Sequence, residues 1–277
     1  MQTIIAVMHD EIDETQIRRA GDILKEGGLV AFPTETVYGL GGNALDAQAS
    51  AKIYAAKGRP SDNPLIVHIA DWDAIYKIAS EIPAEAKKLA DAFWPGPLTM
   101  ILKKSDAVPM ATTGGLDTVA IRMPSNEVAR ALIRAGGGYV AAPSANTSGR
   151  PSPTCAAHVA QDLGGKIEMI IDGGNANIGL ESTIVDLTEG KPTILRPGYI
   201  NQEMLEQVLD EVEMDRGLIS PDSNVHPKAP GMKYRHYAPK ADLIIVEGEA
   251  ARVREKINEL VRENLAAGKK AGVIGTD

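Results

Sequence analysis

Short apolar runs rich in β-branched residues alternate with helical patterns along most of this 277-residue chain. The runs expected to form strands are residues 29–32, 65–69, 98–102, 118–123, 139–142, 167–171, 183–187 and 193–195. The segments expected to form helices are residues 14–26, 47–56, 83–93, 125–134, 153–163 and 202–212. This alternation is typical of the α/β class. Because the last strand runs follow one another with little helix between them, we expect a twisted mixed sheet with flanking helices.

The chain carries a formal net charge of −8, from 29 basic and 37 acidic side chains. That charge argues against bulk nucleic acid or an anionic membrane as the main partner. Hydrophobic residues make up 44% and charged residues 24% of the chain, which excludes the disordered, collagenous and coiled-coil classes. We therefore expect a globular protein.

The cysteine content and the lengths of the apolar runs indicate the cellular compartment in which the protein is expected. Cys155 is the only cysteine, which excludes an intramolecular disulfide and a multi-cysteine zinc or iron–sulfur site. No apolar run approaches the roughly 18 residues of a membrane helix, and the acid-rich residues 1–17 do not match a signal peptide. We expect a cytoplasmic protein without a membrane partner.

The composition changes at about residue 213. Residues 226–240, HPKAPGMKYRHYAPK, contain several prolines and basic residues and no acid, a composition that no regular helix or strand accommodates. We therefore divide the chain into a first domain at 1–212, a proline-rich basic linker at 213–240 and the beginning of a second domain at 241–277.

Within this last piece, strands at 243–246 and 272–274 are expected to flank a helix at about 249–267. A β-α-β unit of this size cannot bury a hydrophobic core alone. We therefore expect either that this piece docks on the first domain or that it is the beginning of a truncated second domain.

Several common catalytic motifs are absent. Gly165 and Lys166 are followed by Ile167, so no Walker A sequence is present. No pair of histidines has the H-E-x-x-H spacing, and no serine lies within G-x-S-x-G. Ligand-binding residues are therefore sought in the loops at strand ends, where open α/β sheets bind their ligands.

The segment PTETVYGL, residues 33–40, directly follows the strand expected at 29–32. Thr34, Thr36 and Tyr38 bring hydroxyl groups to this strand end, where they suit a small polar ligand. An ordinary turn is the alternative.

The segment KGRPSDNPLIVHI, residues 57–69, joins a helix end to a strand. Lys57 and Arg59 place two cations in one loop, which suits phosphate or carboxylate binding, and Asn63 and His68 add hydrogen-bonding groups. Cations at a helix C-terminus are also favoured by the helix dipole, so a solvated pair is the alternative. A histidine in an apolar strand is more often a satisfied core residue than a ligand.

Arg122 lies among apolar residues in the strand expected at 118–123. A buried cation needs a partner, because leaving it unpaired is costly. The partner is either a structural carboxylate or the carboxylate of a ligand, and the sequence leaves both open.

The segment APSANTSGRPSPT, residues 142–154, follows another expected strand. Between positions 144 and 152 its hydroxyl and amide side chains are Ser144, Asn146, Thr147, Ser148 and Ser152. This density favours the binding of an anion or a nucleotide through side chains and backbone N–H groups. An ordinary Ser/Pro-rich loop is the alternative.

The segments ESTIVDL and ILRPG, residues 181–187 and 194–198, are expected to form a hairpin that carries Ser182 and Arg196. Together with the loops described above, this hairpin gathers cations at strand ends in an acidic chain. Such a distribution favours a small polyanionic ligand over a long polyanion.

These motifs occur together in one known family. PTETVYGLGGNA, KGRPSDNPL, WPGPLT, PSAN-x-SG, STIVDL and RPG follow the order found in the YrdC-like family, and residues 10–240 resemble its long-form L-threonylcarbamoyladenylate synthases. The resemblance implies a YrdC-like catalytic domain at 1–212 and the start of a Rossmann-like domain at 241–277. It implies a nucleotidyltransferase that makes threonylcarbamoyl-AMP and pyrophosphate from L-threonine, bicarbonate and ATP. The product serves the threonylcarbamoyladenosine modification of tRNA through downstream transfer machinery.

The resemblance also implies roles for residues at matching positions. The catalytic K-x-R and S-x-N residues are Lys57, Arg59, Ser144 and Asn146. The threonine contacts are Thr36, His68, Arg122, Ser182 and the backbone of Ala142. The ATP contacts are Arg59, Asn63, Thr118, Ser144, Ser152, Arg196 and, from the linker, Tyr234. Mg²⁺ is expected to arrive with ATP, held by phosphates and water, without a metal site on the protein.

A double-stranded RNA-binding module without catalysis is the main alternative, because the same cations could contact the phosphates of tRNA or another RNA. The RNA affinity of such a module should fall steeply as the salt concentration rises, and the module should not bind threonine. The acidic net charge favours the synthase. A carbamoyltransferase of the hydrogenase-maturation type also contains a YrdC-like domain, but the single cysteine excludes its cysteine-rich zinc modules.

Overall fold

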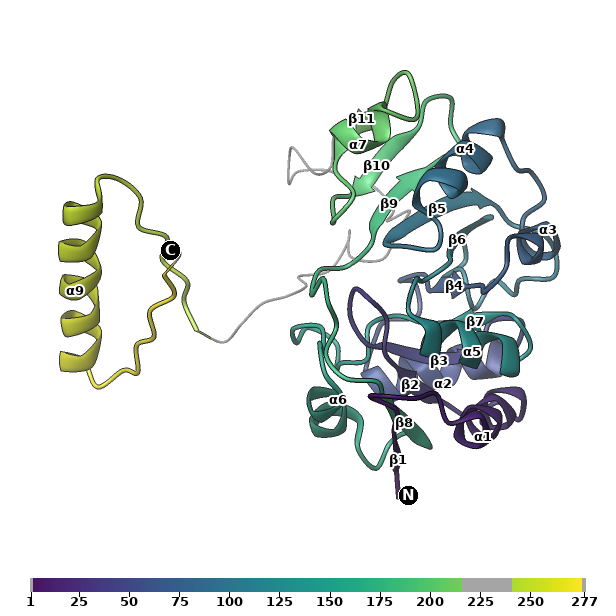
Figure 1. Cartoon of the computed structure of the whole chain (residues 1–277), viewed down its shortest axis with the longest axis horizontal. Coiled ribbons are helices and arrows are strands. Elements are labelled where there is room, and N and C mark those ends of the chain that lie inside the picture. The colour runs from purple at the N-terminus through teal and green to yellow at the C-terminus, as the bar shows by residue number, and fades with distance from the viewer. Residues whose placement is uncertain (1, 216–240, 276–277) are drawn as a thin grey trace. The chain divides into compact units, whose positions relative to one another are not determined.

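The computed structural model describes residues 2–215 and 241–275 of the chain (Figure 1). The chain divides into two compact units, Met1–Ala238 and Pro239–Asp277. The sheet and the candidate site both belong to the first unit.

The described strands of the first unit form one 11-stranded sheet in the order β1-β8-β2-β3-β7-β4-β6-β5-β9-β10-β11. They are β1 (Ile4–Val7), β2 (Val30–Phe32), β3 (Gly39–Asn43), β4 (Ile66–His68), β5 (Leu98–Lys103), β6 (Thr118–Arg122), β7 (Val140–Ala141), β8 (Met169–Asp172), β9 (Thr183–Asp186), β10 (Thr193–Arg196) and β11 (Glu213–Met214). Parallel pairs such as β4–β6 lie beside antiparallel pairs such as β5–β6. The mixed sheet predicted from the sequence is confirmed, and so is the hairpin of β9 and β10.

Helices cover both faces of the sheet. They are α1 (Glu14–Lys25), α2 (Ala47–Lys57), a 3₁₀ turn (Trp72–Ala74), α3 (Ile75–Ile78), α4 (Ala84–Phe93), α5 (Glu127–Ala135), α6 (Ala156–Leu163) and α7 (Gln202–Glu206). Alternate side chains of a strand point to opposite faces. Val30 and Phe32 of β2 therefore join the cluster of α1 and α5, whereas Ala31 joins the cluster of α2, α3, α4 and α6. None of the described helices is both long enough and apolar enough to cross a membrane.

Helix α1 shows how local sequence sets an element. The carboxylate of Asp13 caps its N-terminus by accepting a hydrogen bond from the backbone N–H of Thr15 at 2.9 Å. Ile17, Ala20 and Leu24 then recur at helical spacing and are fully buried against the sheet.

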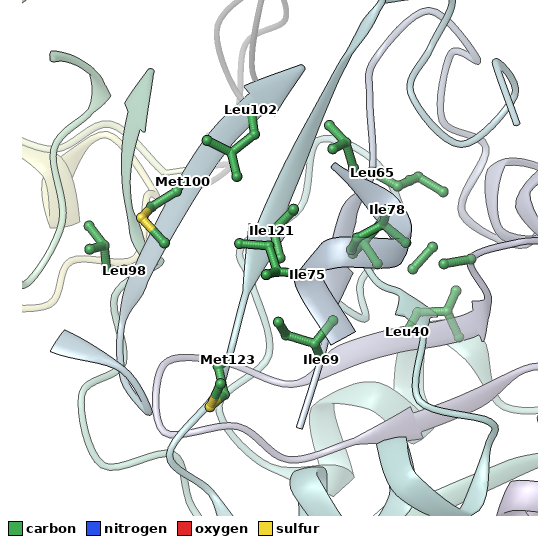
Figure 2. Close-up of a cluster of buried hydrophobic side chains, with 14 of the residues drawn as sticks. Leu40, Leu65, Ile69, Ile75, Ile78, Leu98, Met100, Leu102, Ile121 and Met123 are labelled. Atoms are coloured by element: carbon green, nitrogen blue, oxygen red, sulfur yellow. The ribbon is translucent and has the colours of Figure 1, made fainter. Parts of the chain in front are cut away.

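The core beside the candidate site is built from aliphatic side chains. Leu98, Met100 and Leu102 alternate along one face of β5 and share one buried cluster with Ile121 of β6 and Ile75 of α3 (Figure 2). Thr99, between them, therefore faces the other side of the sheet, where its hydroxyl meets Ser182 at 2.7 Å. On this second face Thr99 reaches the polar site, while Ile101 packs in a separate apolar cluster.

The sequence pattern does not predict β3, whose residues GLGGN lack branched side chains. Close packing explains the strand, because a Cβ on Gly41 would lie 2.8 Å from Cγ1 of Val140 and 3.0 Å from Cε1 of Phe32. Glycine is therefore needed for β3 to approach its neighbours. The pattern also misses β1, β11 and α3, and α7 ends before the predicted residue 212.

The described residues of the second unit contain helix α9 (Ala250–Ala266) and no strand. The prediction of strands at 243–246 and 272–274 is therefore wrong. Leu243 and Ile245 are 76% and 75% exposed, and among residues 2–215 and 241–275 no strand lies beside either segment to complete a hydrogen-bonded ladder. The Rossmann-like character of this piece and the domain boundaries given above remain predictions.

Candidate functional site

A pocket of about 550 Å³, open to solvent, lies where several strand ends meet. The turn after β2, strand β4, the ends of β6, β7 and β10 and the residues before β9 line it. The predicted site residues in its wall are Thr36, Arg59, His68, Arg122, Ala142, Ser144, Ser182 and Arg196.

Other predicted site residues lie outside this wall. They are Lys57, Asn63, Thr118, Asn146 and Ser152. Thr118 begins β6, whereas Arg122 ends it, so the strand separates the two by roughly 13 Å. Tyr234 falls outside the described residues.

Lys57 and Asn146 form the support behind Ser144. The buried Nζ of Lys57 donates to the backbone carbonyl of Asn146 at 2.5 Å and also to the carbonyl of Ser144. The hydroxyl of Ser144 donates to Oδ1 of Asn146 at 2.5 Å. Burial, reinforced by the nearby positive charge of Arg59, holds the pKa of Lys57 well below its ordinary value. The K-x-R loop and the S-x-N loop therefore meet through this lysine.

Arg59 enters the pocket from the same loop. Its Nε donates to the carbonyl of Asn63 at 3.3 Å, and its Nη2 donates to the carbonyl of Pro64 at 3.1 Å. These bonds fold the loop around the guanidinium and leave Arg59 in the pocket wall.

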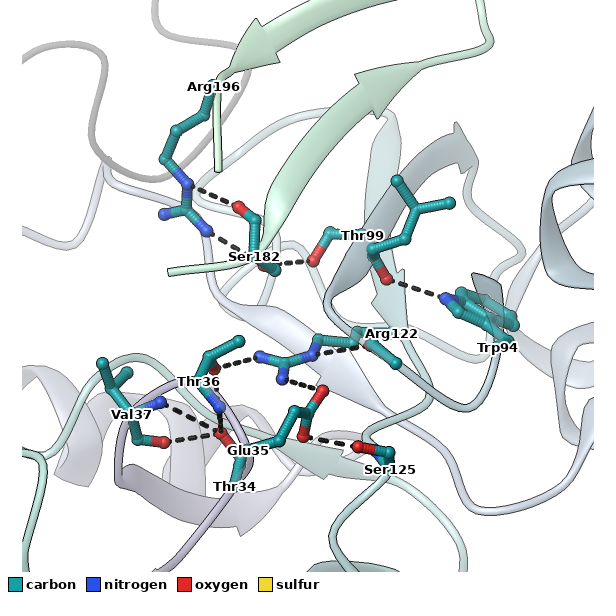
Figure 3. A network of polar contacts seen from close by, with 12 residues as sticks. Thr34, Glu35, Thr36, Val37, Trp94, Thr99, Arg122, Ser125, Ser182 and Arg196 are labelled. Carbon is teal, nitrogen blue, oxygen red and sulfur yellow. Dashed lines mark hydrogen bonds and ion pairs between the residues drawn. The ribbon is translucent and has the colours of Figure 1, made fainter. Parts of the chain in front are cut away.

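Arg122 is held by partners from distant parts of the chain (Figure 3). Its Nη2 lies 2.7 Å from Oε1 of Glu35, and both side chains are buried. Its Nη1 donates to the hydroxyl of Thr36 at 2.9 Å. The hydroxyl of Thr34 donates a hydrogen bond to the carbonyl of Val37. In the contact between the two threonine hydroxyls, Thr36 is therefore the donor and Thr34 the acceptor. The turn after β2 is therefore an ordered network, not an ordinary solvated turn.

Ser182 joins two strands on the other side of the pocket (Figure 3). Arg196 donates from Nε to the backbone carbonyl of Ser182 at 3.0 Å and from Nη2 to its hydroxyl at 3.1 Å. The hydroxyl of Thr99 lies 2.7 Å from the same hydroxyl. The hairpin therefore delivers a serine and an arginine to the pocket as a fixed pair.

His68 lies at the end of β4, in register with Arg122 on β6. Burial, together with the positive charge of Arg122, lowers the pKa of His68 to about 3. The imidazole is therefore neutral near pH 7. Its Nδ1 lies 3.1 Å from the carbonyl of Ile66, an arrangement that favours a proton on Nδ1 and leaves Nε2 as an acceptor.

This pKa predicts a loss of stability in acid. Between pH 6.5 and 3 the unfolded chain protonates His68 while the folded chain does not, so the free energy of unfolding falls as the pH falls. The slope should reach about 1 kcal/mol per pH unit from this group. Urea unfolding from pH 7.5 to pH 5 measures it, and His68→Asn should flatten the profile relative to the wild type. A variant that keeps the wild-type slope would contradict the prediction; the surface change His158→Asn is the matched control.

Several residues of the site are not predicted from the sequence. Glu35 pairs with Arg122, Glu181 adds a carboxylate to the pocket wall, and Thr99 contacts Ser182. Asp162 of α6 accepts from the backbone N–H of Thr147 at 3.0 Å and so ties down the S-x-N loop. The sequence signal that could have identified one of them is Glu35 itself, an acid within the turn PTETVYGL, which is otherwise rich in hydroxyl groups.

Across residues 2–215 and 241–275, no three His, Cys, Asp or Glu side chains cluster in a way that could hold a metal ion. The described wall of the pocket carries three arginines and a single carboxylate, Glu181, a donor set that suits anionic ligands.

Comparisons with known proteins agree with this arrangement. A family model for Sua5, YciO and YrdC, described as telomere recombination, matches residues 22–198, and a model for the threonylcarbamoyl-AMP synthase C-terminal domain matches residues 200–277. The threonylcarbamoyl-AMP synthase of Pyrococcus abyssi is 55% identical over 274 residues, which cover 99% of this chain and 80% of that protein. The synthase of Bacillus subtilis is 51% identical over 266 residues, which cover 96% of this chain and 75% of that protein.

Solved structures of the same family also match this chain. The crystal structure of P. abyssi Sua5 complexed with L-threonine matches with a TM-score of 0.94 at 55% identity and covers 99% of this chain and 81% of that chain. Escherichia coli YciO shares the fold, with a TM-score of 0.64 at 24% identity over 72% of this chain and 96% of that chain. The chain therefore belongs to the Sua5/YciO/YrdC family, in its long form with a C-terminal domain.

Proposed function

We propose that this protein is a threonylcarbamoyl-AMP synthase, which joins L-threonine, bicarbonate and ATP and releases pyrophosphate. The observation that carries the proposal is the buried, anchored Arg122 in the wall of a pocket that also receives Arg59 and Arg196. One cation suits an amino-acid carboxylate, and the others suit a polyphosphate. The names of the relatives and the threonine complex of P. abyssi Sua5 support the same function over an RNA-binding module.

The threonine site is proposed between Arg122 and Ser182. Arg122 binds the carboxylate, and Ser182 and Thr36 offer hydroxyl groups to the amino acid. The neutral His68 offers an imidazole nitrogen that can accept a hydrogen bond from the threonine hydroxyl. The backbone of Ala142 completes this site.

The ATP site is proposed beside it. Its contacts are Arg59, Asn63, Thr118, Ser144, Ser152, Arg196 and Tyr234, with Lys57 and Asn146 supporting Ser144. Two of these residues, Asn63 and Ser152, have a buried side-chain oxygen that lacks a hydrogen-bond partner among the described residues. Burying such a group without a partner is costly, so each oxygen is expected to gain a partner, either a water molecule or a polar group of a ligand.

The reaction requires two bond-forming steps. The ammonium group of threonine and bicarbonate give the N-carboxylate with loss of water and a proton. An oxygen of this carboxylate then attacks the α-phosphorus of ATP, and the bond to pyrophosphate breaks. Positioning and charge stabilisation supply most of the acceleration in such a scheme, and the arginines of the pocket serve both purposes.

The proposal extends to cofactor, location and partners. An ATP-using enzyme of this family takes a divalent cation with the nucleotide, and we assign Mg²⁺ held mainly by phosphate oxygens and water. The lone cysteine suits the reducing cytoplasm. The product passes to the machinery that transfers the threonylcarbamoyl group to tRNA, and contact with tRNA is expected at that step.

Pyrophosphate release tests the function. We expect release from ATP to require both threonine and bicarbonate, because the N-carboxylate must form before it attacks the nucleotide. The assay omits each substrate in turn and uses serine as a control amino acid. Pyrophosphate release that does not depend on threonine would overturn the proposal. Salt-sensitive RNA binding without turnover of ATP would favour the RNA-binding module.

A further inference from the structure

Glu35, the residue that pairs with Arg122, has no role in the proposed reaction. The side chains of Glu35 and Arg122 are 8% and 5% exposed, so the ion pair is withdrawn from solvent. Glu35 lies in the turn between β2 and β3, and 87 positions separate it from Arg122 along the chain. The fold has therefore brought a carboxylate to the one arginine that ends β6 at the pocket.

Both oxygens of the Glu35 carboxylate are engaged. Oε1 accepts from Nη2 of Arg122 at 2.7 Å, and Oε2 accepts from the backbone N–H of Ser125 at 3.2 Å. The backbone carbonyl of Glu35 also accepts from the N–H of Ile178 at 2.9 Å. A carboxylate held at both oxygens has a fixed plane, and it fixes the guanidinium bonded to it.

Arg122 keeps donors for a ligand. Its Nη1 donates to Thr36 at 2.9 Å, and its Nε donates to the carbonyl of Gly96 at 3.4 Å. With the bond to Glu35, these contacts use three of the five N–H groups of a guanidinium. One N–H on Nη1 and one on Nη2 remain, and Arg122 lines the pocket. Each of them can donate to one oxygen of a carboxylate.

We propose that Glu35 is a positioning residue for the amino-acid substrate, which holds Arg122 so that its remaining Nη1 and Nη2 donors receive the substrate carboxylate. The inference rests on the proposed function, because it takes the ligand of Arg122 to be an amino acid. Glu35 does not touch the substrate and acts through Arg122. Removing its charge should therefore weaken threonine binding selectively, without a matching effect on ATP.

The test compares Glu35→Gln and Glu35→Asp with the wild type. Titration calorimetry measures threonine affinity, and pyrophosphate release measures KM for threonine and for ATP. We expect Glu35→Gln to weaken threonine affinity by about 10- to 100-fold, with a matching rise in threonine KM and an unchanged ATP KM. Glu35→Asp keeps the charge and should recover part of the loss.

Glu168→Gln is the matched control. Oε2 of Glu168 accepts from the backbone N–H of Leu29 at 2.7 Å in a partly buried place away from the pocket. This variant should lower Tm without changing threonine affinity. Equal losses of threonine affinity in Glu35→Gln and Glu168→Gln would indicate general destabilisation and overturn the inference.

The remaining outcomes separate the inference from the proposed function. If Glu35→Gln keeps wild-type threonine affinity and KM, the inference fails and the proposed function stands. If the wild type binds threonine but releases no pyrophosphate, the proposed function fails, and calorimetry of the Glu35 variants still decides the inference. A wild type that does not bind threonine would overturn both.

Discussion

Lys57→Ala is expected to slow pyrophosphate release by roughly 100- to 1,000-fold, because the S-x-N loop loses the group that holds it against the K-x-R loop. Nζ of Lys57 donates to the carbonyls of Ser144 and Asn146, and Lys57 is 1% exposed. Without it, Ser144 no longer has a fixed place in the pocket wall. Steady-state assays with saturating threonine and ATP measure this effect.

The same substitution should also destabilise the fold. Two buried carbonyls lose their donor, and truncation of a large side chain leaves a cavity beside them. We expect the free energy of unfolding to fall by about 2–4 kcal/mol, measured by urea unfolding at pH 7. Activity is therefore compared at a temperature where both proteins remain folded.

Lys52→Ala is the matched control for Lys57→Ala. Lys52 lies on the same helix, α2, and its Nζ also donates to a backbone carbonyl, that of Gly27, at 2.6 Å. This bond lies outside the pocket, so the control should retain activity and lose little stability. Near-normal turnover in Lys57→Ala would refute the assignment of this lysine to the catalytic loop pair.

The sequence predicts the central strands well because they are buried on both faces. Such strands appear as continuous apolar runs, as in β5 and β6, and need no tertiary information to be recognised. Strand β3 is different, because its glycines are selected by the closeness of β2 and β7. A constraint imposed by neighbours leaves no periodic pattern in the strand itself.

The sequence predicts which loops form the site but not which side chains pair with one another there. The motifs lead to the family, which the comparisons confirm, and they indicate which loops meet at the pocket. They do not reveal that Lys57 is buried, because a lysine before a glycine at a helix end resembles an ordinary solvated C-terminus. They also cannot identify Glu35 as the partner of Arg122, since that contact depends on how two distant loops pack.

Arg122→Met is expected to raise the threonine KM by about 100-fold, since the substrate carboxylate loses its charged donor. The variant should also lose about 3–5 kcal/mol of stability, because Glu35 would be left as a buried charge without its cation. Threonine-dependent pyrophosphate release and urea unfolding measure the two effects on the same preparation.

The double variant Glu35→Gln with Arg122→Met separates the two roles of this arginine. Replacing both members of a buried ion pair by neutral groups of similar volume removes the penalty of an unpaired charge, so most of the lost stability should return. Threonine binding should stay weak, because no cation remains to receive the carboxylate. If threonine KM recovers together with stability, Arg122 serves only as half of a structural ion pair, and the substrate carboxylate must be bound elsewhere in the pocket.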